Sequence, residues 1–161
     1  MEIIILIVLI VLNGIFAMSE IALVTARKAR LSPRAAAGDK AAQAAIRLGE
    51  HPTRFLSAIQ IGITSIGLLS GIFGESALAG PLSLWMHESL GVPAATAGML
   101  ATVVVVMAVT YLSIVVGELV PKRLGQLAPE RMACLVARPM TALAKISAPF
   151  VLLLSWSTSL I

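Results

Sequence analysis

The sequence has little charge, one cysteine and two histidines. Of its 161 residues, 12% are charged and 58% are hydrophobic, whereas about 25% of the residues in a soluble domain are charged. The single cysteine, Cys134, excludes a disulfide within the chain and a cysteine-based metal cluster. The histidines, His51 and His87, stand in separate polar segments, so a histidine-ligated transition metal is not expected. This composition indicates an integral membrane protein.

Lysine and arginine are absent between Phe55 and Pro121, although the net charge of the chain is +4. The basic residues gather in 27–54 and 122–145, beside the long apolar runs. Such clustering is typical of cytoplasmic loops and of attraction to anionic membrane lipids, so nucleic acid is not expected as a partner. Neither a G-x-S-x-G nor an H-E-x-x-H motif occurs, and we do not expect an enzyme.

Three stretches are long enough to cross a bilayer, which needs about 20 mostly apolar residues. We expect spans at about 2–26, 53–76 and 95–120, in an all-α integral membrane fold that forms a single domain over 1–161. The first run has only Glu2 as an early charge and is too long for a signal peptide, so we interpret it as a retained helix. The N-terminus then faces outside, and the basic loops face the cytoplasm.

The segments outside the spans have helical composition. The basic, alanine-rich segment 27–50 predicts an amphipathic helix on the cytoplasmic side. The last part, about 128–161, allows two interpretations. Hydropathy permits a fourth crossing over 135–161, but Lys145 and Pro149 interrupt it and leave too short an apolar stretch. A juxtamembrane belt of helices at the cytoplasmic interface is favoured.

The first span carries polar residues near its inner end. Ionisable groups inside spans are costly and mark function by default. Asn13 and Glu20 are seven residues apart and share a helical face, with Ser19 beside it. The Asn13-Gly14 step is also a weak point, where unwinding would free backbone carbonyls. The alternative is that Glu20 reaches the membrane interface and pairs with Arg27.

The second span offers Gln60 and Thr64, which are four residues apart and share a face. The alternative for both is ordinary hydrogen bonding between helices. Gly67 and Gly71 form a G-x-x-x-G step, and small residues at that spacing allow helix backbones to approach closely in lipid. The alternative for the glycine pair is a composition that is typical of any membrane helix.

The third span ends in an unusual group of residues. Pro121 has no N–H, so the carbonyl of Gly117, four residues earlier, loses its helical donor. Glu118 adds a charge beside that carbonyl, and the alternative is an i,i+4 salt bridge from Glu118 to Lys122. The three spans together offer carboxylate, hydroxyl, amide and carbonyl oxygens, which suit hard cations such as Mg²⁺ and Ca²⁺ better than zinc or copper.

Three motifs occur in order: N-G-x-F-A-x-S-E-x-A-L at 13–23, F-L-S-x-I-Q-I-G-I-T at 55–64 and G-E-x-x-P-K at 117–122. Together they resemble the transmembrane domain of the cyclin-M/CorC family, and the resemblance covers essentially the whole chain. It implies a homodimer in the plasma (inner) membrane that transports magnesium, generally by efflux coupled to sodium. It also implies three crossings, a juxtamembrane belt, and cytosolic CBS domains in a full-length member, which these 161 residues do not include.

The resemblance also implies which residues bind the ion. The serine of the first helix corresponds to Ser19, and the glutamate of the third to Glu118, with the Gly117 carbonyl nearby. Many members have asparagines in the second helix, where this chain has Gln60 and Thr64 on the comparable face. Supporting roles are expected for Asn13, Glu20, Pro121 and Lys122.

We therefore expect a dimeric Mg²⁺ transporter domain. The alternative is a non-transporting membrane module that anchors and dimerises cytosolic domains and binds Mg²⁺ as a sensor or structural ion. The same residues serve both interpretations.

Overall fold

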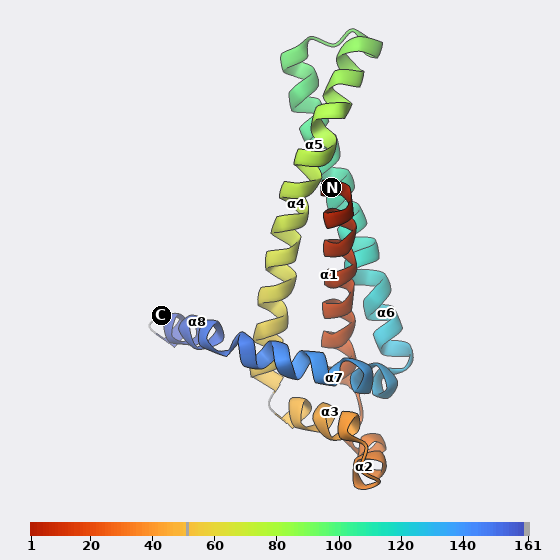
Figure 1. Cartoon of the computed structure of the whole chain (residues 1–161), viewed down its shortest axis with the longest axis vertical. Coiled ribbons are helices and arrows are strands. Elements are labelled where there is room, and N and C mark those ends of the chain that lie inside the picture. Colours follow the sequence, from red (N-terminus) through yellow and green to blue (C-terminus); the bar gives the residue numbers. More distant parts are fainter. Residues whose placement is uncertain (51, 160–161) are drawn as a thin grey trace.

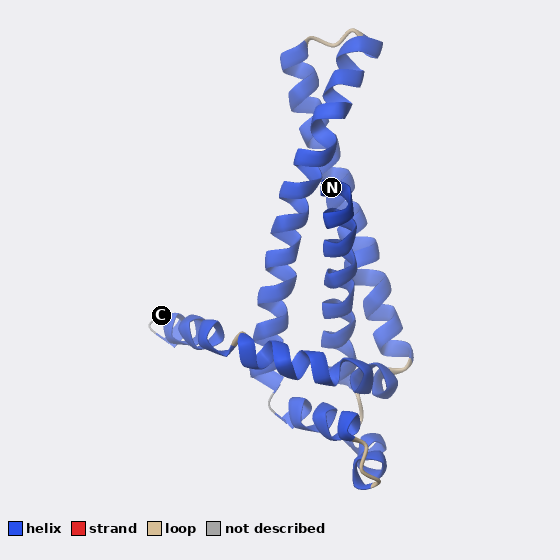
Figure 2. Cartoon of the chain, in the orientation of Figure 1, coloured by secondary structure: helices blue, strands red, loops and turns tan. Residues whose placement is uncertain are grey.

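The computed structural model describes residues 1–50 and 52–159, so His51 lies outside the described residues. Within them, helices account for nearly all of the chain (Figure 1, Figure 2). In chain order the elements are α1 (Glu2–Thr25), α2 (Lys28–Ala36), α3 (Lys40–Glu50), α4 (Pro52–Leu90), α5 (Ala94–Ile114), the π-helical turn η1 (Val115–Leu119), α6 (Val120–Leu127), α7 (Pro129–Ile146) and α8 (Ala148–Ser159).

In the described part of the chain, three helical stretches are long and apolar enough to cross a membrane: Glu2–Thr25, Phe55–Leu90 and Ala94–Leu127. They pack side by side, while α7 and α8 run across one end of them, with α2 and α3 beyond (Figure 1). We call this end, with its many lysines and arginines, the basic end. Large apolar side chains along the three stretches are exposed, such as Leu68 and Met99, as expected of surfaces that face lipid. The predicted all-α membrane fold with three spans is confirmed.

The second span is much longer than hydropathy predicts, because α4 continues from the expected end near residue 76 to Leu90. Hydropathy marks where the apolar run ends, which is not where the helix ends. The residues after 76 are mostly good helix formers, so the helix continues through them. The helix stops at Gly91, whose φ of +66° favours glycine. Just beyond it, the carbonyl oxygen of Val92 lies 2.8 Å from Nδ1 of His87. The polar segment after the second span is therefore a helical extension of that span.

The third span does not end at its proline, as the sequence suggested. It passes through the π turn Val115–Leu119 and continues as α6 to Leu127. The N–H of Val120 donates to the carbonyl of Val115, five residues earlier, which is the π pattern. Pro121 comes just after the π turn, and its missing N–H leaves a carbonyl of that turn without a helical donor. The proline thus accompanies a widened turn inside a continuing helix.

The segment 27–50 forms two helices where one amphipathic helix was expected. The chain turns at Gly38, whose φ is +91°, a value that favours glycine. Asp39 then precedes α3, and its Oδ1 accepts hydrogen bonds from the N–H of Ala42 at 3.2 Å and of Ala41 at 2.9 Å. These bonds, with a smaller contribution from Arg34, hold the pKa of Asp39 below its ordinary value. The capped turn folds α3 back against α2.

The last two helices lie across the ends of the spans (Figure 1). In the described part of the chain, neither α7 nor α8 qualifies as a candidate span, and the juxtamembrane belt stays a prediction. Pro149 is the second residue of α8, a position where proline is tolerated. α7 packs against α1, α3 and α4. These helices share a hydrophobic core at the basic end. Its buried residues are Leu23, Leu31, Ala42, Ala44, Ala45, Phe55, Ile59, Ala133, Cys134, Val136, Ala137 and Met140.

α1 lies between α4 and α6, and glycines allow close contact on both sides. On the α4 side, a Cβ added at Gly62 would collide with the ring of Phe16. On the α6 side, a Cβ added at Gly125 would lie only 2.9 Å from the carbonyl oxygen of Met18. These contacts fix the depth of α1 relative to its neighbours and so position the polar groups described next.

Candidate cation site between the three spans

A buried hydrogen bond joins α1 to the π turn. Asn13 Nδ2 donates to the carbonyl oxygen of Gly117 at 3.1 Å. This carbonyl stands four residues before Pro121, which has no N–H to offer it, so the asparagine side chain takes the place of the helical donor. A Cβ added at Gly117 would lie 3.2 Å from Asn13 Nδ2 and 3.3 Å from the carbonyl oxygen of Ile10. The carbonyl that the sequence predicts to be free is therefore bound by the neighbouring helix.

A cavity of about 200 Å³ adjoins this bond, and all three spans contribute to it. Two buried oxygens of its lining residues have no hydrogen-bond partner among the described residues: Asn13 Oδ1 and Ser113 Oγ. Leaving a buried polar group unpaired costs about 1–3 kcal/mol, so these oxygens favour a polar guest. Gly67 and Gly71 line the cavity and meet no atom within 4 Å of an added Cβ. Their small size leaves space here, where the sequence suggested close helix contact. The described lining residues are Asn13, Ile63, Gly67, Gly71, Val109, Thr110, Ser113, Ile114 and Glu118.

Glu118 carries the charge of this cavity, and Lys122 neutralises it. Lys122 Nζ donates to Glu118 Oε1 at 2.7 Å and lies 3.5 Å from Glu20 Oε2. The i,i+4 salt bridge expected as an alternative is therefore present, and Glu20 faces Lys122 rather than Arg27. All three side chains are only partly buried, with 27–37% of each exposed. Two carboxylates share one ammonium, which leaves one negative charge on the group.

Of the five residues expected to bind the ion, only Glu118 is among the described lining residues of this cavity, and Gly117 takes part through the adjoining hydrogen bond with Asn13. Ser19 is fully buried, and its Oγ donates to the carbonyl of Ile15 at 2.6 Å. Gln60 and Thr64 are exposed, although their spacing places them on the helical face that carries Gly67 and Gly71. α1 runs unbroken through Asn13, so the weak point noted at the Asn13-Gly14 step is helical in this structure. The described arrangement brings together Asn13, Gly117, Glu118, Glu20, Pro121 and Lys122.

Two hydroxyl residues of the cavity, Thr110 and Ser113, were not predicted from the sequence. Both stand in an apolar run on the third span, eight and five residues before Glu118. Their i,i+3 spacing was an available signal, since it places both hydroxyls on one helical face. The π turn then brings that face and Glu118 to the same cavity.

The atoms of this site that can coordinate a cation are oxygens. Among the described residues, no three or more histidine, cysteine, aspartate or glutamate side chains gather where they could hold a metal ion. The site instead combines amide and hydroxyl oxygens with the carboxylate of Glu118. Oxygen donors with few carboxylates suit a hard cation that keeps part of its water shell, or an organic cation, better than a tightly caged transition metal.

The comparison with known proteins agrees with the motifs. Residues 4–161 match the family described as Cyclin M transmembrane N-terminal domain. The UPF0053 protein sll0260 of Synechocystis is 46% identical over 158 residues, which cover 98% of this chain and 35% of that protein. The UPF0053 protein YhdP of Bacillus subtilis is 34% identical over 157 residues, or 96% of this chain and 34% of that protein.

A third relative has a functional name. The polyamine export protein of Haemophilus influenzae is 31% identical over 116 residues, which cover 72% of this chain and 26% of that protein. The chain thus spans about a third or less of the length of these relatives. The match extends over nearly all of the described helices, and the chain belongs to the Cyclin M transmembrane N-terminal domain family.

Proposed function

We propose that this chain is the membrane domain of a transporter that carries Mg²⁺ out of the cell, with Na⁺ as the coupling ion. The observation that carries the proposal is the cavity between the three spans, with its two unpaired oxygens beside Glu118. Its chemistry fits a hard cation. In this proposal the basic end faces the cytoplasm and the N-terminus faces outside, by the positive-inside rule, in the plasma (inner) membrane.

The ion pair suggests how a cation would enter. Lys122 Nζ lies 2.7 Å from Glu118 Oε1. An arriving dication therefore competes with this ammonium group for the carboxylate. Glu20 lies 3.5 Å from the same ammonium and can keep Lys122 paired after it leaves Glu118. The exchange therefore moves a charge between two carboxylates and leaves no cation unpaired in an apolar layer, where an isolated charge is costly.

Ser19, Gln60 and Thr64 remain proposed ligands, and each needs a different arrangement to act. Ser19 has to turn its hydroxyl away from Ile15. Gln60 and Thr64 are exposed in the single chain, so a homodimer that packs this face of α4 against its copy would enclose them. We propose this homodimer as the working unit, with the remaining Mg²⁺ ligands supplied by carbonyls and water, because Mg²⁺ dehydrates reluctantly.

A second candidate cargo is a polyamine. The observation that favours it is the relative named polyamine export protein. An ammonium group of a polyamine could replace that of Lys122 on Glu118 without any dehydrated metal site. The third alternative is a non-transporting module that binds Mg²⁺ while it anchors and dimerises cytosolic domains.

Flux in proteoliposomes separates these three proposals. Purified chain is reconstituted, and the transport of Mg²⁺ and of spermidine is followed with and without a sodium gradient. The test variant is Glu118→Gln, and the matched control is Glu88→Gln, an exposed carboxylate near the far end of α4. We expect sodium-dependent Mg²⁺ flux that falls at least tenfold in Glu118→Gln and is unchanged in Glu88→Gln.

Each alternative gives a different result. Spermidine flux without Mg²⁺ flux would replace the proposed cargo by a polyamine. Mg²⁺ binding to the wild type by calorimetry, without flux of either cation, would favour the anchoring module. Equal flux in Glu118→Gln and wild type would remove Glu118 from the transport site.

A further inference from the structure

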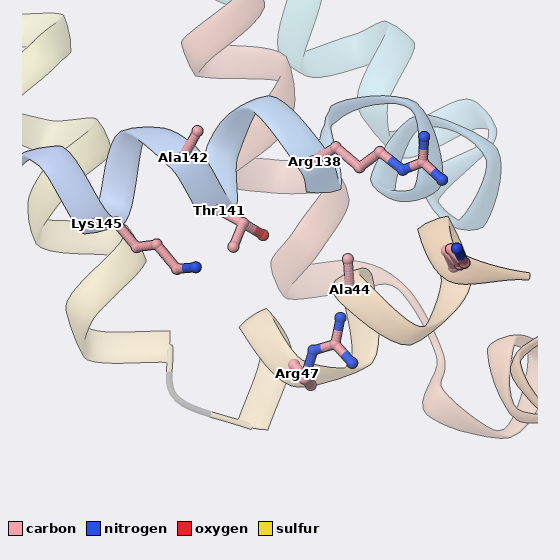
Figure 3. Close-up of a pocket in the computed structure, with 7 residues that line it drawn as sticks. Ala44, Arg47, Arg138, Thr141, Ala142 and Lys145 are labelled. Atoms are coloured by element: carbon pink, nitrogen blue, oxygen red, sulfur yellow. The ribbon is translucent and has the colours of Figure 1, made fainter.

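A cavity rich in positive charge lies between α3 and α7 at the basic end (Figure 3). Its volume is about 570 Å³. α3 contributes Lys40 and Arg47, and α7 contributes Arg138 and Lys145. In Figure 3 the side chains of Arg47 and Lys145 extend into the space between the two helices. Four cationic side chains from two separate helices thus surround one space.

These cations have no carboxylate partner within 4.0 Å in the described part of the chain, whereas cations of the neighbouring helix α2 do have one. Lys28 pairs with Glu50 at 2.6 Å, and Arg34 pairs with Asp39 at 2.8 Å. Like charges that share a cavity repel one another and raise the local positive potential, which attracts an anion. Two arginines among the four add planar donors that suit phosphate oxygens. The cavity is therefore suited to a phosphate group.

A second cavity lies next to the first. It has a volume of about 700 Å³ and shares Arg47, Thr141 and Lys145 with the basic cavity. It extends along α4 and α8, where most of its lining is apolar. The residues outside the shared set are Leu48, Thr53, Phe55, Ser57, Ala144, Ala148, Val151 and Leu152. The two cavities together are thus charged at one end and mainly apolar at the other.

We propose that the two cavities form one binding site for an anionic phospholipid. Its phosphate lies among Lys40, Arg47, Arg138 and Lys145, and an acyl chain follows the apolar groove along α8. A free phosphate would satisfy the cations but leave the groove unfilled, so the combined shape favours the lipid over the headgroup alone. The site lies where the belt helices meet the end of a candidate span, so a bound lipid would hold α3, α7 and α8 together at the membrane surface.

The site is tested on the purified chain in a neutral detergent. Lipid adducts are counted by native mass spectrometry, and melting temperature is followed during titration with each probe. The three probes are phosphatidylglycerol, phosphatidylcholine with the same acyl chains, and glycerol phosphate. We expect one retained phosphatidylglycerol per chain and a saturable rise in melting temperature with that lipid alone. Equal effects of phosphatidylcholine would overturn the anionic site, and equal effects of glycerol phosphate would overturn the lipid in favour of a soluble phosphate.

Matched variants locate the binding. Arg138→Gln with Lys145→Gln should weaken phosphatidylglycerol binding about 25-fold, because a cation near the headgroups contributes roughly fivefold. The control, Arg27→Gln with Arg131→Gln, removes two exposed cations that line neither cavity and should change binding less than threefold.

The groove has its own variant. Ala148→Phe places a ring in the apolar part and should weaken the lipid while leaving all four cations intact. All these positions are exposed, and melting without lipid shows whether each variant is folded. Equal losses in the two double variants, or full binding by Ala148→Phe, would refute the site.

Discussion

The contact between α1 and α6 makes a sharp prediction for Gly125→Ala. A Cβ there would lie 2.5 Å from Ile21 Cγ2 and 2.9 Å from the carbonyl oxygen of Met18. Carbon atoms in contact prefer about 3.5–4.0 Å, and carbon to carbonyl oxygen about 3.3–3.6 Å. The Ile21 side chain can rotate, but the Met18 carbonyl belongs to the helix. Relief therefore requires α6 to move by roughly half an ångström, by the difference between those distances.

The magnitude follows from two opposing effects. Alanine in place of glycine favours a helix by about 1 kcal/mol, and crowding of a packed contact costs about 1–3 kcal/mol. The matched control is Gly98→Ala in α5, where an added Cβ meets only Ser83 Oγ, at an ordinary contact distance of 3.8 Å, so the favourable effect operates without crowding. We expect Gly125→Ala to be less stable than Gly98→Ala by about 1–3 kcal/mol, which is roughly 2–12 °C in melting temperature for a chain of this size.

Thermal unfolding of both variants in the same detergent measures this difference. Equal melting temperatures would refute the tight contact between α1 and α6. The double variant Gly125→Ala with Ile21→Ala separates the two collisions, because it removes the isoleucine methyl and keeps the Met18 carbonyl in place. We expect only partial recovery relative to Ile21→Ala alone. Complete recovery would mean that the backbone contact is not limiting.

Two further predictions concern the hydrogen bonds of single side chains. Asn13→Leu removes the donor to the buried Gly117 carbonyl and should destabilise the chain by about 1–3 kcal/mol in thermal unfolding; wild-type stability would show that this carbonyl finds another donor. Because the pKa of Asp39 is lowered in the fold, its contribution is present above the unfolded pKa and is lost as the pH falls from about 4 through the lowered value. Asp39→Asn keeps an acceptor oxygen without the charge, so the melting temperatures of the two proteins should converge on acidification between pH 5 and 3, and a constant gap would contradict the charged cap.

Local sequence patterns predict well where one helix decides the outcome. The apolar run that begins near Glu2 predicts a helix that ends at about residue 26. α1 ends at Thr25, within one residue of this boundary. The four-residue spacing of Glu118 and Lys122 predicts their ion pair, which forms at 2.7 Å. In both cases the relevant neighbours are close in sequence.

Contacts between distant segments are less accessible to such patterns. Pro121 indicates that the Gly117 carbonyl needs another partner, but nothing local indicates that Asn13, 104 residues away from that carbonyl, supplies it. The sequence did not predict the end of α4. The lack of lysine and arginine after the second span indicates on which side of the membrane that segment lies. The length of the helix depends instead on the helix propensity of the residues up to Gly91. Whether Gln60 and Thr64 meet an ion remains a prediction for the assembled transporter.

The π turn also changes the phase of the third span. One additional residue in a turn rotates everything that follows by about 100° relative to an uninterrupted α-helix. Pro121, Lys122 and Gly125 face α1 only in this shifted phase. Deletion of a single residue from Val115–Leu119 would restore α-helical register with little change in hydropathy, yet it would swing Lys122 away from Glu20. When related sequences are aligned, a gap of one residue at this turn therefore changes which side chains of α6 face α1, even when every side chain around the turn is retained.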